Sequence, residues 1–229
     1  MRYTRSKFWL TAILLFLIMI KAKSQEKTYS YLALGDSYTI GESVDASMRW
    51  PVQLVNQVNR QGHGFSIEQP EIIATTGWTT QELRKAIAER KPKKDYDLVS
   101  LLIGVNNQYR GYPLEDYPTE FRSLLETAIE HAAGDASRVF VVSIPDYAFT
   151  PFGASKREEI TKGIDEYNEI NKRISEELDV RYFNITPISR KGLDDKALVA
   201  NDKLHPSAIQ YSQWVELILS NDIFIDLLK

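Results

Sequence analysis

The chain has 229 residues, of which 43% are hydrophobic and 26% are charged. This composition is typical of one globular domain with a sizeable core and excludes a disordered or fibrous protein. The net charge of −3, without a basic cluster interleaved with aromatic residues, excludes an ordinary nucleic-acid-binding protein. No cysteine is present, which excludes disulfides and cysteine-ligated metals.

Residues 1–24 have the pattern of a signal peptide. Three basic residues among the first seven precede an uncharged apolar block at 8–20, and Ala22 and Ser24 then have the small-x-small spacing of a cleavage site. The block is shorter than the roughly 20 residues that a membrane-spanning helix needs, which favours cleavage over an uncleaved anchor. Removing five basic and no acidic side chains takes the net charge from −3 to −8. The sequence therefore predicts an exported protein, periplasmic or secreted, with one domain over residues 25–229.

Short apolar runs alternate with longer helical segments along this domain. The runs are rich in β-branched and aromatic residues, which indicates strands, and they lie at residues 29–34, 71–74, 97–103, 138–144 and 180–185. Apolar residues repeat every three or four positions in the segments 79–90, 121–129, 160–178 and 214–219. Thr79 and Glu82 fit a capping box at the start of the first of these helices. The alternation predicts a three-layer α/β/α sandwich with a central parallel sheet of about five strands.

Polar and glycine residues follow the predicted strands. Ligands of open parallel sheets bind outside the carboxyl ends of the strands, so these positions are candidates for a site. They read Gly35-Asp36-Ser37, Thr76-Gly77-Trp78, Gly104-Val105-Asn106-Asn107 and Pro145-Asp146-Tyr147. We interpret the stop after the first apolar run as either a simple turn or the placement of a reactive serine at a strand end.

A nucleophilic serine needs a base, and imidazole is best matched to neutral pH. Of the three histidines, His63 lies in a polar turn and His131 in the last turn of a predicted helix, where a positive charge suits the helix dipole. His205 follows Asp202 by three residues, a spacing at which a carboxylate can orient the imidazole. We expect Pro206 to open the final helix.

Ester cleavage also needs hydrogen-bond donors for the developing oxyanion. The candidates are the backbone N–H groups of Ser37 and Gly77 and the side-chain amide of Asn106. A glycine at position 77 allows the backbone to approach a substrate closely. Gly77 also fits a plain strand-to-helix turn, and Asn106 also fits a turn-stabilising amide.

The chain contains four short motifs in this order: Gly-Asp-Ser, Gly, Gly-x-Asn and, near the carboxyl end, Asp-x-x-His. In these motifs and their order it resembles the SGNH hydrolases, also called GDSL esterases and lipases. The resemblance implies a flavodoxin-like sandwich in which Ser37 is the nucleophile, His205 the base and Asp202 its orienting carboxylate. It implies an oxyanion hole formed by Ser37, Gly77 and Asn106.

Two positions depart from the family pattern. Tyr38 stands where the family motif has Leu. Asn107 stands where the family usually has Asp, which affects a contact behind the site rather than the oxyanion donor itself.

The resemblance leads us to expect a serine esterase that cleaves small carboxylic esters, either short acyl esters or acetyl groups on carbohydrate, without cofactor or metal. Lysophospholipid or thioester cleavage is the runner-up. Two other classes remain as alternatives: a catalytically inactive relative that binds glycans or lipids, and a flavin- or nucleotide-binding module. We expect no nucleic-acid partner and no stable membrane insertion after cleavage. Aromatic residues on or near the rim, as candidates for substrate contacts, are Tyr38, Trp50, Trp78, Tyr109, Tyr112, Tyr147 and Phe149.

Overall fold

A five-stranded parallel sheet forms the centre of the protein, in a computed structural model that describes residues 27–220. The strand order is β4-β2-β5-β6-β7, so the first two strands of this sheet in chain order exchange places at its edge, as in flavodoxin-like folds. The strands are β2 (Tyr31–Gly35), β4 (Glu71–Ala74), β5 (Leu98–Leu102), β6 (Val139–Val142) and β7 (Arg181–Phe183). A separate pair of short parallel strands is formed by β1 (Lys27–Tyr29) and β3 (Phe65–Ile67).

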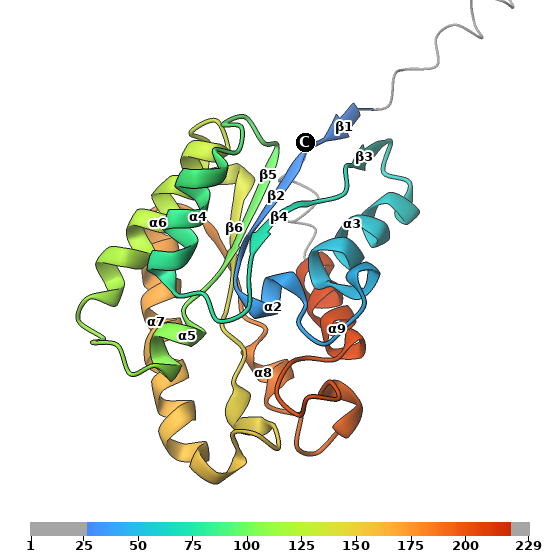
Figure 1. Ribbon diagram of the computed structural model, residues 1–229. Helices are drawn as coiled ribbons and strands as arrows, with labels where there is room; N and C mark the ends of the chain where they lie inside the picture. The colour runs from blue at the N-terminus through green and yellow to red at the C-terminus, as the bar shows by residue number, and fades with distance from the viewer. Residues whose placement is uncertain (1–26, 221–229) are drawn as a thin grey trace, which may run out of the picture.

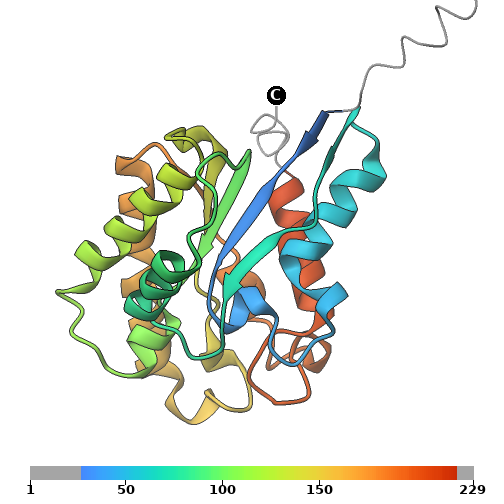
Figure 2. The same ribbon diagram turned by 45° about the horizontal axis from the view of Figure 1, so that its top comes forward.

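Helices cover both faces of the sheet (Figures 1 and 2). One layer holds α4 (Thr80–Arg90), α6 (Tyr117–His131) and α7 (Arg157–Glu177), and the other holds α3 (Trp50–Gln61) and α9 (Ala208–Leu219). Short helices connect them: α2 (Ser37–Ile40), α5 (Val105–Tyr109) and α8 (Thr186–Ser189). Single 3₁₀ turns occur at Ala46–Met48, Ala136–Arg138, Tyr147–Phe149, Ala154–Lys156 and Lys196–Leu198. The expected three-layer sandwich with a parallel sheet of five strands is confirmed.

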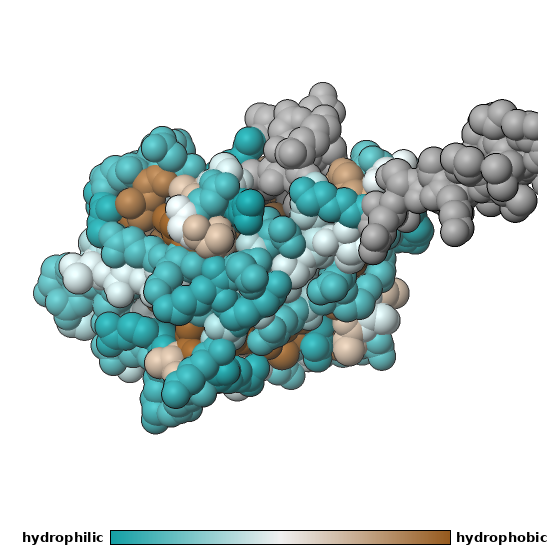
Figure 3. Space-filling model, turned by 90° about the horizontal axis from the view of Figure 1, so that it is seen from above, coloured by the Kyte–Doolittle hydropathy of each residue, from teal (hydrophilic) through white to brown (hydrophobic). Residues whose placement is uncertain are grey.

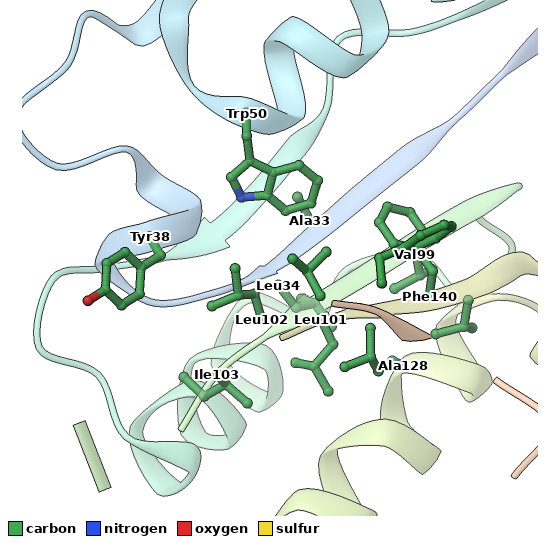
Figure 4. Packing of buried hydrophobic residues seen from close by; sticks show 14 of the residues in the cluster. Ala33, Leu34, Tyr38, Trp50, Val99, Leu101, Leu102, Ile103, Ala128 and Phe140 are labelled. Atoms are coloured by element: carbon green, nitrogen blue, oxygen red, sulfur yellow. The ribbon is translucent and has the colours of Figure 1, made fainter. Parts of the chain in front are cut away.

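The core lies on both faces of the sheet because its central strands are covered on both sides. Every residue of β2, β5 and β6 is buried, which explains why these strands read as continuous apolar runs rather than as alternating patterns. At the start of α3, the fully buried Trp50 ring packs edge-on against Phe140 of β6, with ring centroids 6.2 Å apart (Figure 4). Trp50, an expected rim residue, is therefore part of the core.

Two local expectations are corrected by the structure. The first predicted strand is interrupted at Ser30, whose backbone N–H and hydroxyl both donate to Asp97 Oδ2 at 2.9 Å. The final helix begins at Ala208 with Ser207 as its N-cap, so Pro206 precedes the helix instead of opening it. Pro206 instead forms an isolated antiparallel bridge with Val199. By contrast, the capping box of Thr79 and Glu82 is present.

The predicted signal peptide lies outside the described residues. Within residues 27–220, no helix combines the length and the apolar character needed to cross a bilayer. Figure 3 views the end of the molecule at which β2 begins, and hydrophilic side chains cover most of it, with only small, separate apolar areas. The carboxyl ends of the strands lie at the opposite end of the molecule.

Strand order determines where a crevice forms at that opposite end. The chain leaves β2 for α2 and α3 on one face, whereas it leaves β5 for α5 and α6 on the other. Because these connections diverge between neighbouring strands, the sheet has its topological switch point between β2 and β5. Ser37 follows β2, Asn106 follows β5 and Gly77 follows the adjacent β4, so all three residues lie around this point.

Asn107 joins the helices behind the crevice. Its Oδ1 accepts from the Thr80 N–H at 3.1 Å, and its Nδ2 donates to Thr80 Oγ1 at 2.7 Å and to Glu120 Oε2 at 3.3 Å. The Thr80 hydroxyl also donates to Glu120. The amide of Asn107 therefore links a carboxylate on α6 to the start of α4.

We predict that Asn107→Asp destabilises the fold by about 2 kcal/mol at neutral pH. The substitution removes a buried donor and places a second carboxylate beside Glu120. Repulsion raises the pKa of the pair in the folded state, so the loss should be greatest above neutral pH and shrink on acidification. Urea unfolding at several pH values measures this.

The double variant Asn107→Asp/Glu120→Gln again pairs one carboxylate with one amide, so it should recover most of the lost free energy of unfolding. Glu120→Gln alone is the control. Equal unfolding midpoints for wild type and Asn107→Asp at pH 7 would contradict the role of this pairing.

Candidate active site

Ser37 is presented by a tight turn between β2 and α2. The Asp36 carbonyl accepts from the N–H groups of Thr39 and Ile40 at 3.1 and 2.9 Å, and Asp36 Oδ1 accepts from the Tyr38 N–H at 3.0 Å. A side chain at Gly35 would place its Cβ 2.2 Å from Thr39 Oγ1 and 2.5 Å from the Leu102 carbonyl oxygen. Only glycine allows this close approach. The serine therefore begins a helix directly at the strand end, with an N–H that has no partner within the helix.

Asp36 lies beneath this turn, fully buried. Burial raises its pKa to about 7, although the hydrogen bond from the Tyr38 backbone acts in the opposite direction. Its Oδ2 has no hydrogen-bond partner within residues 27–220. The carboxyl is therefore substantially protonated near neutral pH, which limits the negative charge next to Ser37.

A cavity of about 300 Å³ opens beside Ser37 at the carboxyl ends of the strands. Its lining residues are Ser37, Tyr38, Thr76, Gly77, Val105, Asn106, Tyr109, Tyr147, Phe152, Leu204 and His205. A larger open groove of about 900 Å³ runs along α7, but of the predicted residues it contains only the aromatic candidate Phe149 and none of the catalytic or oxyanion candidates. The smaller cavity is the candidate site because the predicted serine, histidine and amide donors line it together.

Asn106 and Gly77 lie on the wall formed by the connections after β5 and β4. Asn106 Nδ2 donates to the Trp78 carbonyl at 3.0 Å, which fixes the side-chain amide and leaves a second N–H on the same nitrogen. Gly77 has a φ of +86°, a left-handed conformation that favours glycine. Arg110 holds this turn through a 2.5 Å hydrogen bond to the Gly77 carbonyl and an ion pair with Glu82.

His205 and Asp202 form a hydrogen-bonded pair on the opposite wall. His205 Nδ1 lies 2.6 Å from Asp202 Oδ2, while Asp202 Oδ1 accepts from the backbone N–H groups of Leu204 and His205 at 2.9 and 3.0 Å. The Ser43 hydroxyl donates to Asp202 Oδ2 at 2.7 Å. With Nδ1 engaged by Asp202, the imidazole has Nε2 available for the cavity.

Hydrogen bonding controls the charge of Asp202. Burial raises the pKa of Asp202, but hydrogen bonds from Ser43, His205 and two backbone N–H groups outweigh this effect and lower it to about 2. Because the folded-state pKa lies below the ordinary value, ionised Asp202 stabilises the fold above about pH 4, and this contribution is lost as the pH falls towards 2. Asp202 is therefore fully ionised at neutral pH.

The other two histidines lie away from the cavity. His131 is buried, and its Nδ1 is 2.7 Å from the Lys93 carbonyl oxygen. His63 is exposed, and its Nε2 is 2.7 Å from Gln61 Oε1. Among residues 27–220, no group of three or more His, Cys, Asp or Glu side chains is arranged to hold a metal ion.

Sequence reasoning found part of the aromatic lining. Tyr38, Tyr109 and Tyr147 line the cavity as expected, whereas Trp78, Tyr112 and Phe149 do not. Phe152 and Ser43 were missed. The only sequence signal for Phe152 is its place in the long irregular segment after the fourth predicted strand, and Ser43 has none, because its contact with Asp202 joins residues 159 positions apart.

A family model described as the GDSL-like lipase/acylhydrolase family matches residues 33–212. Comparison with curated proteins gives no match. Among solved structures, TesA is 17% identical with a TM-score of 0.64, covering 87% of this chain and 99% of its own. The acetylxylan esterase Axe2 from Geobacillus stearothermophilus is 18% identical with a TM-score of 0.64, covering 89% and 98%. The esterase EstA from Pseudoalteromonas sp. is 17% identical with a TM-score of 0.60, covering 84% and 95%.

The structural likenesses establish a shared fold, and the family model establishes relatedness over most of the chain. The matched segment runs from β2 into α9 and contains Ser37, Gly77, Asn106, Asp202 and His205. The resemblance drawn from the sequence motifs is thereby confirmed. The chain belongs to the GDSL-like lipase/acylhydrolase family.

Proposed function

We propose that this protein is an exported serine hydrolase of small carboxylic esters, in which Ser37 is the nucleophile, His205 the base and Asp202 its orienting carboxylate. One observation carries the proposal. Ser37 and His205 line the same cavity, and Asp202 is hydrogen-bonded to His205 Nδ1, which leaves Nε2 to accept the serine proton. Ionised Asp202 selects the tautomer with a proton on Nδ1 and stabilises the imidazolium that forms during turnover.

The reaction proceeds through an acyl-enzyme. Ser37 Oγ bonds to the ester carbonyl carbon as its proton passes to His205 Nε2. The tetrahedral intermediate then collapses, the bond to the alcohol oxygen breaks, and His205 returns the proton to the departing alcohol. A water molecule then attacks the acyl carbonyl carbon as its proton passes to His205 Nε2. The bond to Ser37 Oγ breaks, His205 returns the proton to Ser37, and the acid is released.

Three donors converge on the developing oxyanion in this mechanism. They are the Ser37 N–H at the start of α2, the Gly77 N–H and the remaining N–H of the Asn106 amide. The bond from Asn106 to the Trp78 carbonyl orients the side-chain amide, and the bond from Arg110 to the Gly77 carbonyl holds the turn that contains the Gly77 N–H, both before substrate binds. Donors that are already oriented need no reorganisation as charge develops, which is why they lower the barrier.

Cavity size and charge favour small neutral esters over the alternative substrates. A volume of about 300 Å³ is at the lower end for ligand pockets, and no Asp, Glu, Lys or Arg lines the cavity within the described part of the chain. Lysophospholipids and coenzyme A thioesters carry anionic leaving groups, for which this lining offers no cationic partner. The fold likeness to an acetylxylan esterase agrees with short acyl substrates.

We predict that Ser37→Ala abolishes hydrolysis of p-nitrophenyl acetate and covalent labelling by a fluorophosphonate. The reason is the loss of the attacking oxygen, which leaves only binding and oxyanion stabilisation. Ser155→Ala, at an exposed serine outside the cavity, serves as the control and should retain both activities. A wild-type protein that neither turns over esters nor reacts with the probe would support the inactive-relative alternative instead.

Asp202→Asn should lower kcat by roughly 10³- to 10⁴-fold while changing KM little, because the amide no longer selects the tautomer or stabilises the imidazolium. Steady-state kinetics with p-nitrophenyl acetate measure the effect, and Asp194→Asn on the exposed surface of a nearby turn is the matched control. Unchanged kcat in Asp202→Asn would mean that another group orients His205.

Export is proposed from the pattern of residues 1–24 alone. When the full chain is expressed in a bacterial host, the intact mass of the exported product should correspond to a start at or near Gln25. A full-length product recovered with the membrane fraction would contradict cleavage and favour an anchor.

A further inference from the structure

Two exposed aromatic rings stand at the mouth of the catalytic cavity. Tyr109 is 59% exposed and Phe152 is 49% exposed, yet both line the cavity that contains Ser37 and His205. Together with the buried Tyr147 they form a cluster whose ring centroids lie 6.2 to 6.4 Å apart. Exposing large apolar rings to water is unfavourable, and such exposure beside a cavity is typical of a ligand-binding surface.

Tyr147 is locked in place at the base of this cluster. Its hydroxyl donates to Gln108 Oε1 at 2.9 Å. Gln108 in turn occupies a notch in α7 at Gly163, where an added Cβ would lie 2.8 Å from Gln108 Nε2. A glycine inside a long helix is unfavourable relative to alanine, and the close packing of Gln108 against Gly163 explains why a glycine occurs there.

Phe152 is held by an equally tight turn. The Thr150 hydroxyl donates to the Tyr147 carbonyl at 2.8 Å, and a Cβ at Gly153 would lie 2.2 Å from that same oxygen. The Phe152 N–H donates to the Lys203 carbonyl at 3.1 Å. The backbone that carries the ring is therefore attached to the loop of Asp202 and His205 before any ligand binds, so less backbone ordering is needed on binding.

The attachment to the histidine loop indicates which part of an ester these rings contact. In the proposed mechanism His205 protonates the departing alcohol, so the alcohol must lie on the His205 side of the cavity. Phe152 and Leu204 lie on that side, and Tyr109 faces Phe152 from the end of α5. The lining is also uncharged within the described residues, so it suits a neutral alcohol.

We propose that Tyr109 and Phe152 bind the leaving alcohol and select one that contains a neutral six-membered ring. The C–H groups on the face of such a ring pack against an aromatic face and leave water as they do so. A pyranose sugar and an alicyclic or aromatic alcohol share this chemistry. The inference rests on the proposed esterase function and adds the identity of the alcohol side.

The experiment uses acetates that share one acyl group. All of them form the same acetyl-enzyme, so kcat/KM reports the step in which the alcohol is still bound. The series is ethyl acetate, cyclohexyl acetate, benzyl acetate and a mono-O-acetylated methyl xylopyranoside, and the last three separate alicyclic, aromatic and sugar rings. Comparing each variant with wild type on one substrate cancels intrinsic differences in ester reactivity.

Tyr109→Ala and Phe152→Ala should each lower kcat/KM for one or more of the ring acetates by about 5-fold more than they lower it for ethyl acetate. Tyr109→Phe and Phe152→Tyr retain the rings and should behave as wild type. Met48→Ala, at a side chain that is 46% exposed outside the cavity, is the control for loss of an exposed apolar group. A loss confined to the sugar acetate would identify a carbohydrate ester, and a loss confined to benzyl or cyclohexyl acetate would identify a non-sugar alcohol.

Two outcomes would overturn the proposal. Equal losses on ethyl acetate and the ring acetates would mean that the rings maintain the site rather than select the alcohol. Losses that grow from ethyl acetate to ethyl butyrate and ethyl hexanoate would place the acyl chain on the rings. In both cases hydrolysis by wild type and labelling of Ser37 would leave the esterase function intact, whereas their absence would overturn the function and this inference together.

Discussion

The close approach of Gly35 to Thr39 and to the Leu102 carbonyl is the constraint on which the site depends. It brings the start of α2 against the end of β5, so the chain turns directly from strand to helix at Ser37. Asn106 follows β5 by a few residues and therefore lies near the serine without a long loop. A larger residue at position 35 would separate these two elements and, with them, the serine from the amide.

Two aspartates near the cavity have opposite electrostatic environments. Asp36 is enclosed in the core and its pKa rises to about 7, whereas Asp202 receives several hydrogen bonds and its pKa falls to about 2. Separation of pKa values between neighbouring carboxyl groups is how one fold assigns them different roles. Here the fixed negative charge lies behind His205, where it favours the imidazolium, and the charge beside Ser37 is reduced.

A second set of contacts, farther from the proposed reacting atoms, holds the walls of the cavity in place. The Asn107–Glu120 pairing joins the helices behind Asn106, and the Gln108 contact at Gly163 joins α5 to α7. Both begin on α5, the short helix that carries Asn106 and ends at Tyr109. The same five-residue helix thus carries both the proposed oxyanion donor and the proposed alcohol-binding ring.

The layered α/β class, the five strands of the central sheet and the residues at their ends could be predicted from the sequence, because strand length and apolar pattern are local properties of the chain. Its short motifs also led to Ser37, Gly77, Asn106, Asp202 and His205. Three features needed the folded structure: Trp50 belongs to the core, Asn107 is paired with Glu120 on another helix, and Phe152 lies beside the loop that carries Asp202 and His205. These facts depend on contacts between residues far apart in the chain, and side-chain packing across elements leaves no periodic signal in the sequence.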